Sequence, residues 1–396
     1  MLVRFRLYSV LKNLRFADPM LVLFLLDRHF SLTAIGAWLG AQHLLTTVLE
    51  FPMGVVADRF GRRSSLAASF LAYALSFVLL PMAVPGGWAL GAGLAVFGVG
   101  EALRTGSHKA IMLDWLDQRG QADQAVEVVG LTRTWSRASS GFAAMTGGVL
   151  LWATQDWSVL YGLSAVAAVL GFGLLLSYPR SLEGEQSRER GSRAPLRERL
   201  RRLARGGVGL VGQSIVFESN VKLMRKFALQ PFLKQGLALS GLPVVGTGAL
   251  AIGAVELAGD LIGAAGARSA PRLRDTAGGI QPALRWAYRG GLAGMAVLAL
   301  CSWMDWPWAI WVGVAAAVGV WALQNARRPV FVAAFGARID KTQRATSLSL
   351  ESLARTLVLS VLLPVSGALA DAFGLWAAFT LAAGLMALGL LLRDRA

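Results

Sequence analysis

Twelve long apolar runs, separated by short charged segments, constrain this chain more than any other feature of its sequence. A helix that crosses a bilayer needs roughly 20 mostly apolar residues. Only 16% of the 396 residues are charged, whereas soluble proteins carry about 25%, so a soluble core could not hide this much apolar surface. The sequence therefore predicts an all-α membrane protein with twelve transmembrane helices. The runs cover residues 8–27, 32–56, 64–84, 88–112, 137–155, 157–178, 209–233, 240–266, 285–303, 307–333, 347–369 and 374–392.

The composition excludes several kinds of site. Cys301 is the single cysteine, so the chain has no disulfide framework and no cysteine-based metal centre. The three histidines form no HExxH pair, and the sequence contains no GxxxxGK[ST] loop. We therefore expect no cofactor, no metal site and no enzymatic chemistry. The net charge of +16 does not indicate nucleic acid as a partner, because the arginines lie in loops between apolar runs.

Basic residues are distributed unequally between alternate loops, which predicts the orientation of the chain. Basic loops stay on the cytoplasmic side of a membrane, so we expect both termini in the cytoplasm. The compact loops indicate a bacterial inner membrane, and we expect a monomer in contact with membrane lipids. The basic loop residues are Arg4, Arg6, Arg59, Arg62, Arg63, Arg268, Arg272, Arg274, Arg338, Lys341, Arg344, Arg393 and Arg395. Tryptophans expected to form an outer interfacial belt are Trp88, Trp152, Trp157, Trp303, Trp306, Trp308 and Trp376.

Residues 179–206 interrupt the apolar rhythm and divide the chain into two parts. Residues 1–178 and 207–396 each hold six of the runs. In the basic second part of this interruption, one helical face would carry Leu196, Leu200 and Leu203. This pattern indicates a cytoplasmic linker that carries a basic amphipathic helix on the anionic inner leaflet, and a solvated linker is the alternative.

Weak internal matches relate the two parts. Asn13-Leu14-Arg15 lines up with Asn220-Val221-Lys222, and Ala102-Leu103-Arg104 lines up with Ala322-Leu323-Gln324. The matches come in the same order and at similar offsets, which indicates a duplication. We therefore expect two pseudo-repeated six-helix bundles, a plan known from transporters that bind substrate near the bilayer midplane.

A glycine-rich basic motif follows the second run and reads Gly54-Val-Val-Ala-Asp58-Arg59-Phe-Gly61-Arg62-Arg63. It resembles the signature G-x-L-a-D-r-x-G-r-[RK] of the major facilitator superfamily, with Val56 in place of the leucine. The resemblance implies a secondary transporter that works by alternating access. It also implies that the motif is a cytoplasmic gate that does not contact substrate, formed by Gly54, Asp58, Arg59, Gly61, Arg62 and Arg63. The antiporter motif of the fifth helix is poorly matched, because its proline is missing.

Among the charged residues inside the apolar runs, seventeen bear on the function. Each costs about 3 kcal/mol at a bilayer centre, so the sum of about 50 kcal/mol exceeds the stability of a domain. Most of these side chains must therefore face a polar path or a partner. They are Lys12, Arg15, Asp18, Glu50, Glu101, Arg104, Lys109, Glu218, Lys222, Arg225, Lys226, Glu256, Asp260, Arg327, Arg328, Glu351 and Arg355.

Helical spacing gathers some of these residues on single faces. Glu101, Arg104 and His108 follow i, i+3, i+7 on the expected fourth helix, and Glu218 and Lys222 follow i, i+4 on the seventh. Structural ion pairing within or between helices, such as Glu218 with Lys222, is the alternative to a role in transport. We expect the substrate-binding residues to be Arg15, Glu101, Arg104, Glu218, Lys222, Arg225 and Gln324.

The balance of charge bears on the solute and on its coupling ion. Basic residues outnumber acidic ones inside the runs, and arginine suits carboxylate or phosphate, which favours a small organic anion. If the acids neutralise the bases, the solute is neutral or cationic, as for a multidrug or cation–proton exporter. A lipid flippase on the same fold also stays open. Proton coupling needs a buried carboxylate, and the candidates are Glu101, Glu218, Glu256 and Asp260.

Overall fold

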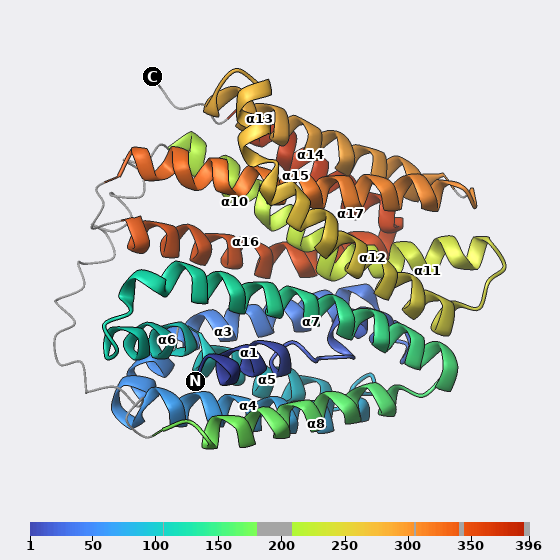
Figure 1. The fold of residues 1–396 in the computed structure, drawn as a ribbon. Coiled ribbons are helices and arrows are strands. Elements are labelled where there is room, and N and C mark those ends of the chain that lie inside the picture. Colours follow the sequence, from blue (N-terminus) through green and yellow to red (C-terminus); the bar gives the residue numbers. More distant parts are fainter. Residues whose placement is uncertain (106, 180–207, 305, 340–343, 392–396) are drawn as a thin grey trace. The chain divides into compact units, whose positions relative to one another are not determined.

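The computed structural model describes residues 1–105, 107–179, 208–304, 306–339 and 344–391 (Figure 1). Within these residues the regular structure is helical, and no strand occurs. The predicted linker at 179–206, with its amphipathic helix, lies outside the described residues except for its first residue, as do the basic residues of 340–343 and 392–396.

The N-terminal part of the chain forms eight α-helices, counted over the described residues. They are α1 (Leu2–Leu11), α2 (Leu21–Asp27), α3 (Leu32–Phe60), α4 (Arg62–Leu79), α5 (Ala89–Arg104), α6 (Ser107–Asp117), α7 (Ala125–Thr154) and α8 (Trp157–Leu176). Single 3-10 turns at Asp18–Met20, Leu80–Met82 and Ala122–Gln124 precede α2, follow α4 and precede α7.

The described residues of the C-terminal part also form α-helices. Its described helices are α10 (Val208–Leu223), α11 (Leu229–Leu239), α12 (Val244–Arg268), α13 (Ala270–Thr276), α14 (Ile280–Trp303), α15 (Ala309–Ala337), α16 (Arg344–Phe373) and α17 (Leu375–Gly389). A π-helical turn at Met224–Ala228 joins α10 to α11 without a break.

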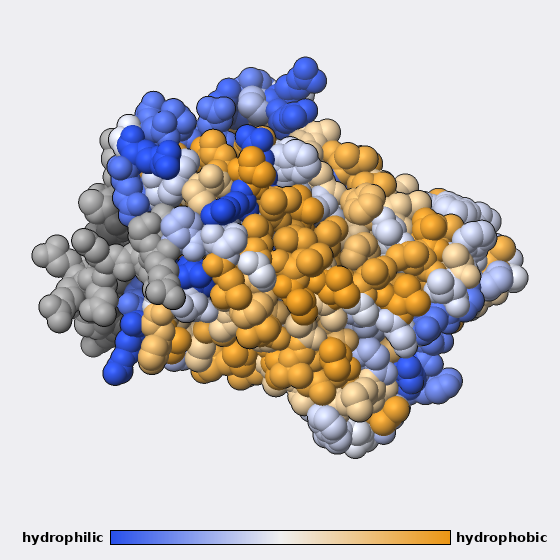
Figure 2. Space-filling view, turned by 60° about the horizontal axis from the view of Figure 1, so that its bottom comes forward, coloured by the Kyte–Doolittle hydropathy of each residue, from blue (hydrophilic) through white to orange (hydrophobic). Residues whose placement is uncertain are grey.

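Each of the twelve predicted runs corresponds to one helix or to consecutive helices, and the short α13 is additional. Six of the described helices are long and apolar enough to cross a membrane: α3, α4 with its following turn, α8, α12, α15 and α16. Broad areas of hydrophobic surface are visible in Figure 2. Large apolar side chains such as Leu75 and Leu170 are exposed. So much exposed apolar surface is suited to contact with lipid and not with water. These findings confirm an all-α membrane fold.

Contacts divide the chain into two compact units. Unit 1 comprises residues 1–30, 41–191 and 245–257, and unit 2 comprises residues 31–40, 192–244 and 258–396. In unit 1, α4 packs against α5 and α8, and α1 packs against α7. In unit 2, α14 packs against α15 and α17, and α10 packs against α16.

Within unit 2, the first turns of α3 lie directly on α16. A Cβ atom at Gly36 would lie 2.3 Å from the Leu363 carbonyl oxygen, and one at Gly367 would lie 2.2 Å from the Leu32 carbonyl oxygen. Such close backbone packing requires residues without a side chain. The Asp371 carboxylate then accepts hydrogen bonds from Leu32 N at 3.0 Å and Thr33 N at 2.7 Å. These bonds satisfy donors that the start of a helix leaves free.

Within unit 1, the first half of α12 lies against α7 in the same manner. A Cβ atom at Gly148 would lie 2.6 Å from the Ala249 carbonyl oxygen, and one at Gly253 would lie 2.6 Å from the Ala144 carbonyl oxygen. Gly148 and Ala144 lie in the poorly matched antiporter motif of this helix, and these contacts give them a packing role.

The first predicted run is not one continuous helix. The chain leaves the α-helical path after Leu11 and regains helical structure at Asp18–Met20, where Pro19 stands in the first turn and its missing N–H is tolerated. Ser164 of α8 replaces one of the helical hydrogen bonds that the break removes, since its hydroxyl oxygen accepts a hydrogen bond from Phe16 N at 2.9 Å. Gly147 of α7 makes room for the break, because a Cβ atom there would lie 2.5 Å from the Phe16 carbonyl oxygen.

The fourth predicted run is also interrupted, and this corrects one expectation. Thr105 caps α5 with an extended backbone, and its hydroxyl donates to the Glu101 carbonyl oxygen at 2.9 Å. His108 therefore belongs to α6 and does not continue the face of Glu101 and Arg104. Its ring stacks on Tyr8, with centroids 3.6 Å apart.

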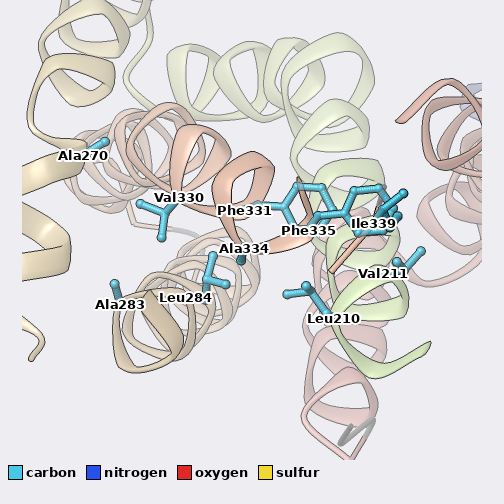
Figure 3. Packing of buried hydrophobic residues seen from close by; sticks show 10 residues of the cluster. All are labelled: Leu210, Val211, Ala270, Ala283, Leu284, Val330, Phe331, Ala334, Phe335 and Ile339. Carbon is cyan, nitrogen blue, oxygen red and sulfur yellow. The ribbon is translucent and has the colours of Figure 1, made fainter. Parts of the chain in front are cut away.

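The core of unit 2 includes a cluster contributed by α10, α13, α14 and α15 (Figure 3). Phe331 and Phe335 stack one helical turn apart, with ring centroids 5.5 Å apart. Their neighbours are Leu210, Val211, Ala270, Ala283, Leu284, Val330, Ala334 and Ile339. The cluster holds α15 in place, and α15 carries three polar residues of the site described below.

One member of the expected tryptophan belt is buried instead. Trp157 lies inside unit 1, where its indole Nε1 donates to Asp27 Oδ2 at 2.8 Å. A buried indole needs such an acceptor, and this bond ties the start of α8 to the end of α2. Trp88, Trp152, Trp303, Trp306 and Trp308 are exposed.

Candidate functional site

Unit 1 contains a compact polar cluster, which we call the unit 1 cluster, formed by Arg15, Tyr73, Glu101 and Arg104. The Glu101 carboxylate accepts hydrogen bonds from Arg15 Nη2 at 2.8 Å and from Arg104 Nη2 at 2.6 Å. The Tyr73 hydroxyl donates to Glu101 Oε1 at 2.8 Å and accepts from Arg104 Nε at 2.9 Å. Both carboxylate oxygens of Glu101 are therefore occupied by groups from α4, from α5 and from the non-helical break in the first run.

The break in the first run places Arg15 in this cluster. Its guanidinium carbon lies 4.3 Å from the centre of the Tyr73 ring and 4.9 Å from the centre of the Phe97 ring. These distances are typical of cation–π contacts. Tyr73 and Phe97 come from α4 and α5, and the sequence offered no signal for either, because each is one aromatic residue in an apolar run.

Unit 2 contains a larger network, which we call the unit 2 cluster. It joins α10, α15 and α16, and its members are Ser214, Glu218, Gln324, Arg327, Arg328, Glu351 and Arg355. Glu218 Oε2 accepts from Gln324 Nε2 at 2.7 Å and from Arg355 Nη1 at 3.4 Å. The contacts described for Glu218 thus go to other helices and not to Lys222 on its own helix.

Glu351 is the second acid of the unit 2 cluster, and its side chain is fully buried. Arg328 donates to both of its oxygens, at 3.0 and 3.1 Å, in a bidentate pair. Ser214 Oγ donates to Glu351 Oε1 at 2.9 Å, and Arg355 Nε lies 3.2 Å from the same oxygen. Sequence reasoning placed Glu351 and Arg355 among the charges of the runs but not among the site residues.

Arg327 is the most buried basic residue of the unit 2 cluster, with 1% of its side chain exposed. Its guanidinium carbon lies 4.7 Å from the centre of the Phe217 ring. Arg327 Nη1 lies 3.9 Å from Glu218 Oε1, which is too long for a hydrogen bond. Among the described residues, neither of these two atoms has a hydrogen-bond partner. The Glu218 carboxylate and the Arg327 guanidinium are therefore only partly satisfied.

Two further candidates lie beside the unit 2 cluster on the seventh run. Lys222 is half-buried near the end of α10. Arg225 lies in the π-helical turn, and its guanidinium carbon is 3.2 Å from the centre of the Trp321 ring. Single π-helical turns inside helices are frequent at functional sites.

Glu256 and Asp260 occupy consecutive turns of α12. Glu256 is buried and Asp260 is half-buried. Both have interactions with neighbouring groups. Neither belongs to the unit 1 or unit 2 cluster, so their role in proton coupling stays a prediction.

The basic motif forms the end of α3, a one-residue turn and the start of α4. Gly61, with φ of +95°, makes the turn, which explains its glycine. Arg62 pairs with Asp114 of α6 and lies 4.0 Å from Asp58. Arg63 donates to the carbonyl oxygens of Leu175 and Leu176 at the end of α8. Within unit 1 the motif thus joins the end of α3 and the start of α4 to α6 and α8.

The two remaining residues of the motif are Gly54 and Arg59. A Cβ atom at Gly54 would meet nothing within 4 Å, so close helix approach does not explain this glycine. Arg59 is exposed, and its guanidinium carbon lies 5.7 Å from the centre of the Phe60 ring.

Comparison with known proteins places the chain in a family. The model of the Major Facilitator Superfamily matches residues 13–326. None of the curated proteins compared with the chain matches it.

Solved structures share the fold at low sequence identity. The nucleoside transporter NupG superposes with a TM-score of 0.77 at 12% identity, covering 99% of this chain and 96% of that one. A bacterial homologue of the human lysosomal transporter Spinster gives 0.72 at 16% identity, covering 99% and 96%. A D-xylose–proton symporter gives 0.70 at 15% identity, covering 98% and 94%. The family match and these folds agree, and the chain belongs to the major facilitator superfamily of membrane transporters.

Proposed function

We propose that this transporter moves a small organic anion across the membrane by alternating access, coupled to protons. The observation that carries the proposal is the surplus of basic groups in each polar cluster. In unit 1, Arg15 and Arg104 share the single carboxylate of Glu101. In unit 2, Arg327, Arg328 and Arg355 share the carboxylates of Glu218 and Glu351.

A surplus of guanidinium groups inside a span is costly unless something offsets it. Each carboxylate can neutralise one charge, so one positive charge is left over in each cluster. A carboxylate or phosphate on the solute is the simplest counter-charge, and arginine binds such groups with two parallel hydrogen bonds. The aromatic rings of Tyr73, Phe97 and Phe217 lie against these arginines and offer apolar contact to the organic part of a solute.

Glu218 is the best candidate for carrying the proton. Its Oε1 has no hydrogen-bond partner among the described residues, whereas both oxygens of Glu101 accept hydrogen bonds from arginine. Protonation at Oε1 would therefore break no hydrogen bond described for Glu218. Protonation removes a negative charge beside Arg327 and Arg355, which strengthens their attraction for an anion. Since such coupling is reciprocal, a bound anion would also favour the proton, as in symport.

The similar folds are compatible with this proposal but do not select the solute. One of the similar structures is a D-xylose–proton symporter and another is a nucleoside transporter. We further propose that the basic motif is a cytoplasmic gate, that both termini lie in the cytoplasm of a cell with this protein in its inner membrane, and that the transporter is a monomer surrounded by lipid.

Thermal unfolding of the detergent-purified protein tests the proposal. The panel holds anions (succinate, benzoate and inorganic phosphate), neutral solutes (xylose and uridine) and a lipophilic cation (tetraphenylphosphonium), at an acidic and a neutral pH. A ligand at about 100 times its Kd stabilises the folded state by about 2.7 kcal/mol. We expect stabilisation by an anion that is stronger at acidic pH. Stabilisation confined to the cation would contradict the proposal and favour a multidrug exporter.

A further inference from the structure

Lys12 is a basic group inside the first span that the sequence analysis did not assign to the site. It caps the end of α1, just before the break in the first run. Its side chain is half-buried. Within the described part of the chain its ammonium group makes no ion pair or hydrogen bond, so its charge, which is costly inside a span, has no offsetting contact.

The charges around Lys12 do not offset it. The charged groups that act on it are Arg104, Arg15 and Glu101. The single carboxylate among them already accepts hydrogen bonds from both arginines. Glu50 of α3 is a further acid whose charge reaches Glu101, but it is not among the groups that act on Lys12. The ammonium group therefore lies in a field with a net positive sign.

The break in the first run fixes the place of Lys12. Gly147 and Ser164 hold the backbone at Phe16, four residues further on. Asn13 donates to the Ser9 carbonyl oxygen and to Ser136 Oγ, both at 2.7 Å. The backbone on either side of Lys12 is thus anchored, whereas its side chain is left without a partner. Such an arrangement costs stability and is retained where the group has a ligand to bind.

We propose that Lys12 is a second anion-binding group of the transporter, which takes an acidic group of the solute directly. The inference rests on the proposed function, since it assumes that the solute is an anion. An ammonium group makes a point-charge contact with three donors, so it suits a carboxylate or phosphate oxygen and no particular orientation of it. Arg15 and Arg104 already hold Glu101, whereas Lys12 has no such partner among the described residues.

The test compares Lys12→Gln, Lys12→Met and Lys12→Arg with the wild-type protein in the same thermal assay, using succinate, benzoate and inorganic phosphate as probes. Lys109→Gln is the matched control, because Lys109 is an exposed lysine of the same unit on α6. Without ligand, we expect Lys12→Arg and Lys109→Gln to unfold at the wild-type temperature, and the two uncharged Lys12 variants to unfold at that temperature or above it, because they remove a charge that has no partner. Loss of one charge-assisted contact should weaken binding of the stabilising anion about 10- to 100-fold in the two uncharged variants, while Lys12→Arg and Lys109→Gln keep their affinity.

A second measurement uses the wild-type protein and needs no variant. Acetylation of lysines with an N-hydroxysuccinimide ester, mapped by mass spectrometry, should be slowed at Lys12 by the bound anion and unchanged at Lys109. Unchanged affinity in both uncharged variants, or equal labelling of Lys12 with and without the anion, would overturn the role of Lys12 and leave the proposed function standing. Failure of every anion to stabilise the wild-type protein would instead overturn the proposed function, and the role of Lys12 with it.

Discussion

Replacement of Glu351 by glutamine should destabilise unit 2 by a measurable amount. The substitution keeps the shape of the side chain and removes the charge that Arg328 and Arg355 share. Removing one partner of a buried ion pair costs about 3–5 kcal/mol. The Arg328 side chain is 29% exposed, so its guanidinium can regain water, and we expect a cost at the lower end, about 3 kcal/mol.

Thermal unfolding in detergent, followed by tryptophan fluorescence, measures this effect. In a unit of about 200 residues a loss of 1 kcal/mol lowers Tm by roughly 2–4 °C, so Tm should fall by about 6–12 °C. Glu127→Gln is the matched control, because Glu127 is an exposed acid of α7 and surface changes of this kind stay within about 0.5 kcal/mol.

The double variant Glu351→Gln, Arg328→Gln sharpens the test. It removes the charge that the single variant leaves unpaired, so part of the lost Tm should return, as expected for residues that interact directly. A wild-type Tm in Glu351→Gln would refute the reasoning, because it would mean that this buried carboxylate does not hold the network together.

Three further variants test other parts of the structure. Glu218→Gln mimics the protonated acid, so binding of the stabilising anion should lose its dependence on pH; a dependence equal to that of the wild-type protein would assign the proton to another group. Asp58→Asn should lower transport severalfold and leave anion affinity unchanged, because the motif contacts other helix ends and not the polar clusters; lost affinity in a folded variant would argue against a gate. Gly36→Leu should abolish folding or transport, since even a Cβ atom would lie 2.3 Å from the Leu363 carbonyl oxygen; normal yield, Tm and uptake together would show that this close packing is dispensable.

The spans were predictable from the sequence because hydropathy over about 20 residues is a strong signal. The breaks inside them were not, since each depends on one or two residues and on partners from elsewhere in the chain. The backbone of Thr105 turns out of the helical conformation at the end of α5, and Ser164 of α8 satisfies a backbone donor at the break near Phe16. For this reason His108, expected on the face of Glu101, stacks on Tyr8 instead.

The polar clusters were predictable in part. The pair Glu101 and Arg104 is visible from its spacing of three residues along one helix. The arrival of Arg15 from another segment is not, because spacing gives no information about contacts between helices. For the same reason the spacing of four residues favoured Lys222 as the partner of Glu218, whereas Gln324 and Arg355 reach it from α15 and α16. The residues bound to Glu351 were not predicted as site residues, because they come from three helices and spacing along one helix does not reveal such contacts.

Uptake into proteoliposomes tests the central claim most directly. The purified protein is reconstituted into lipid vesicles, the anion that stabilises it best is supplied outside in labelled form, and the outer pH is set below, equal to or above the inner pH. The account predicts protein-dependent uptake that rises when the outside is acidic and that is abolished by a protonophore. Uptake indifferent to the pH gradient would contradict the coupling to protons, and the absence of any protein-dependent anion uptake, in vesicles that transport a neutral or cationic solute, would contradict the account of the basic clusters.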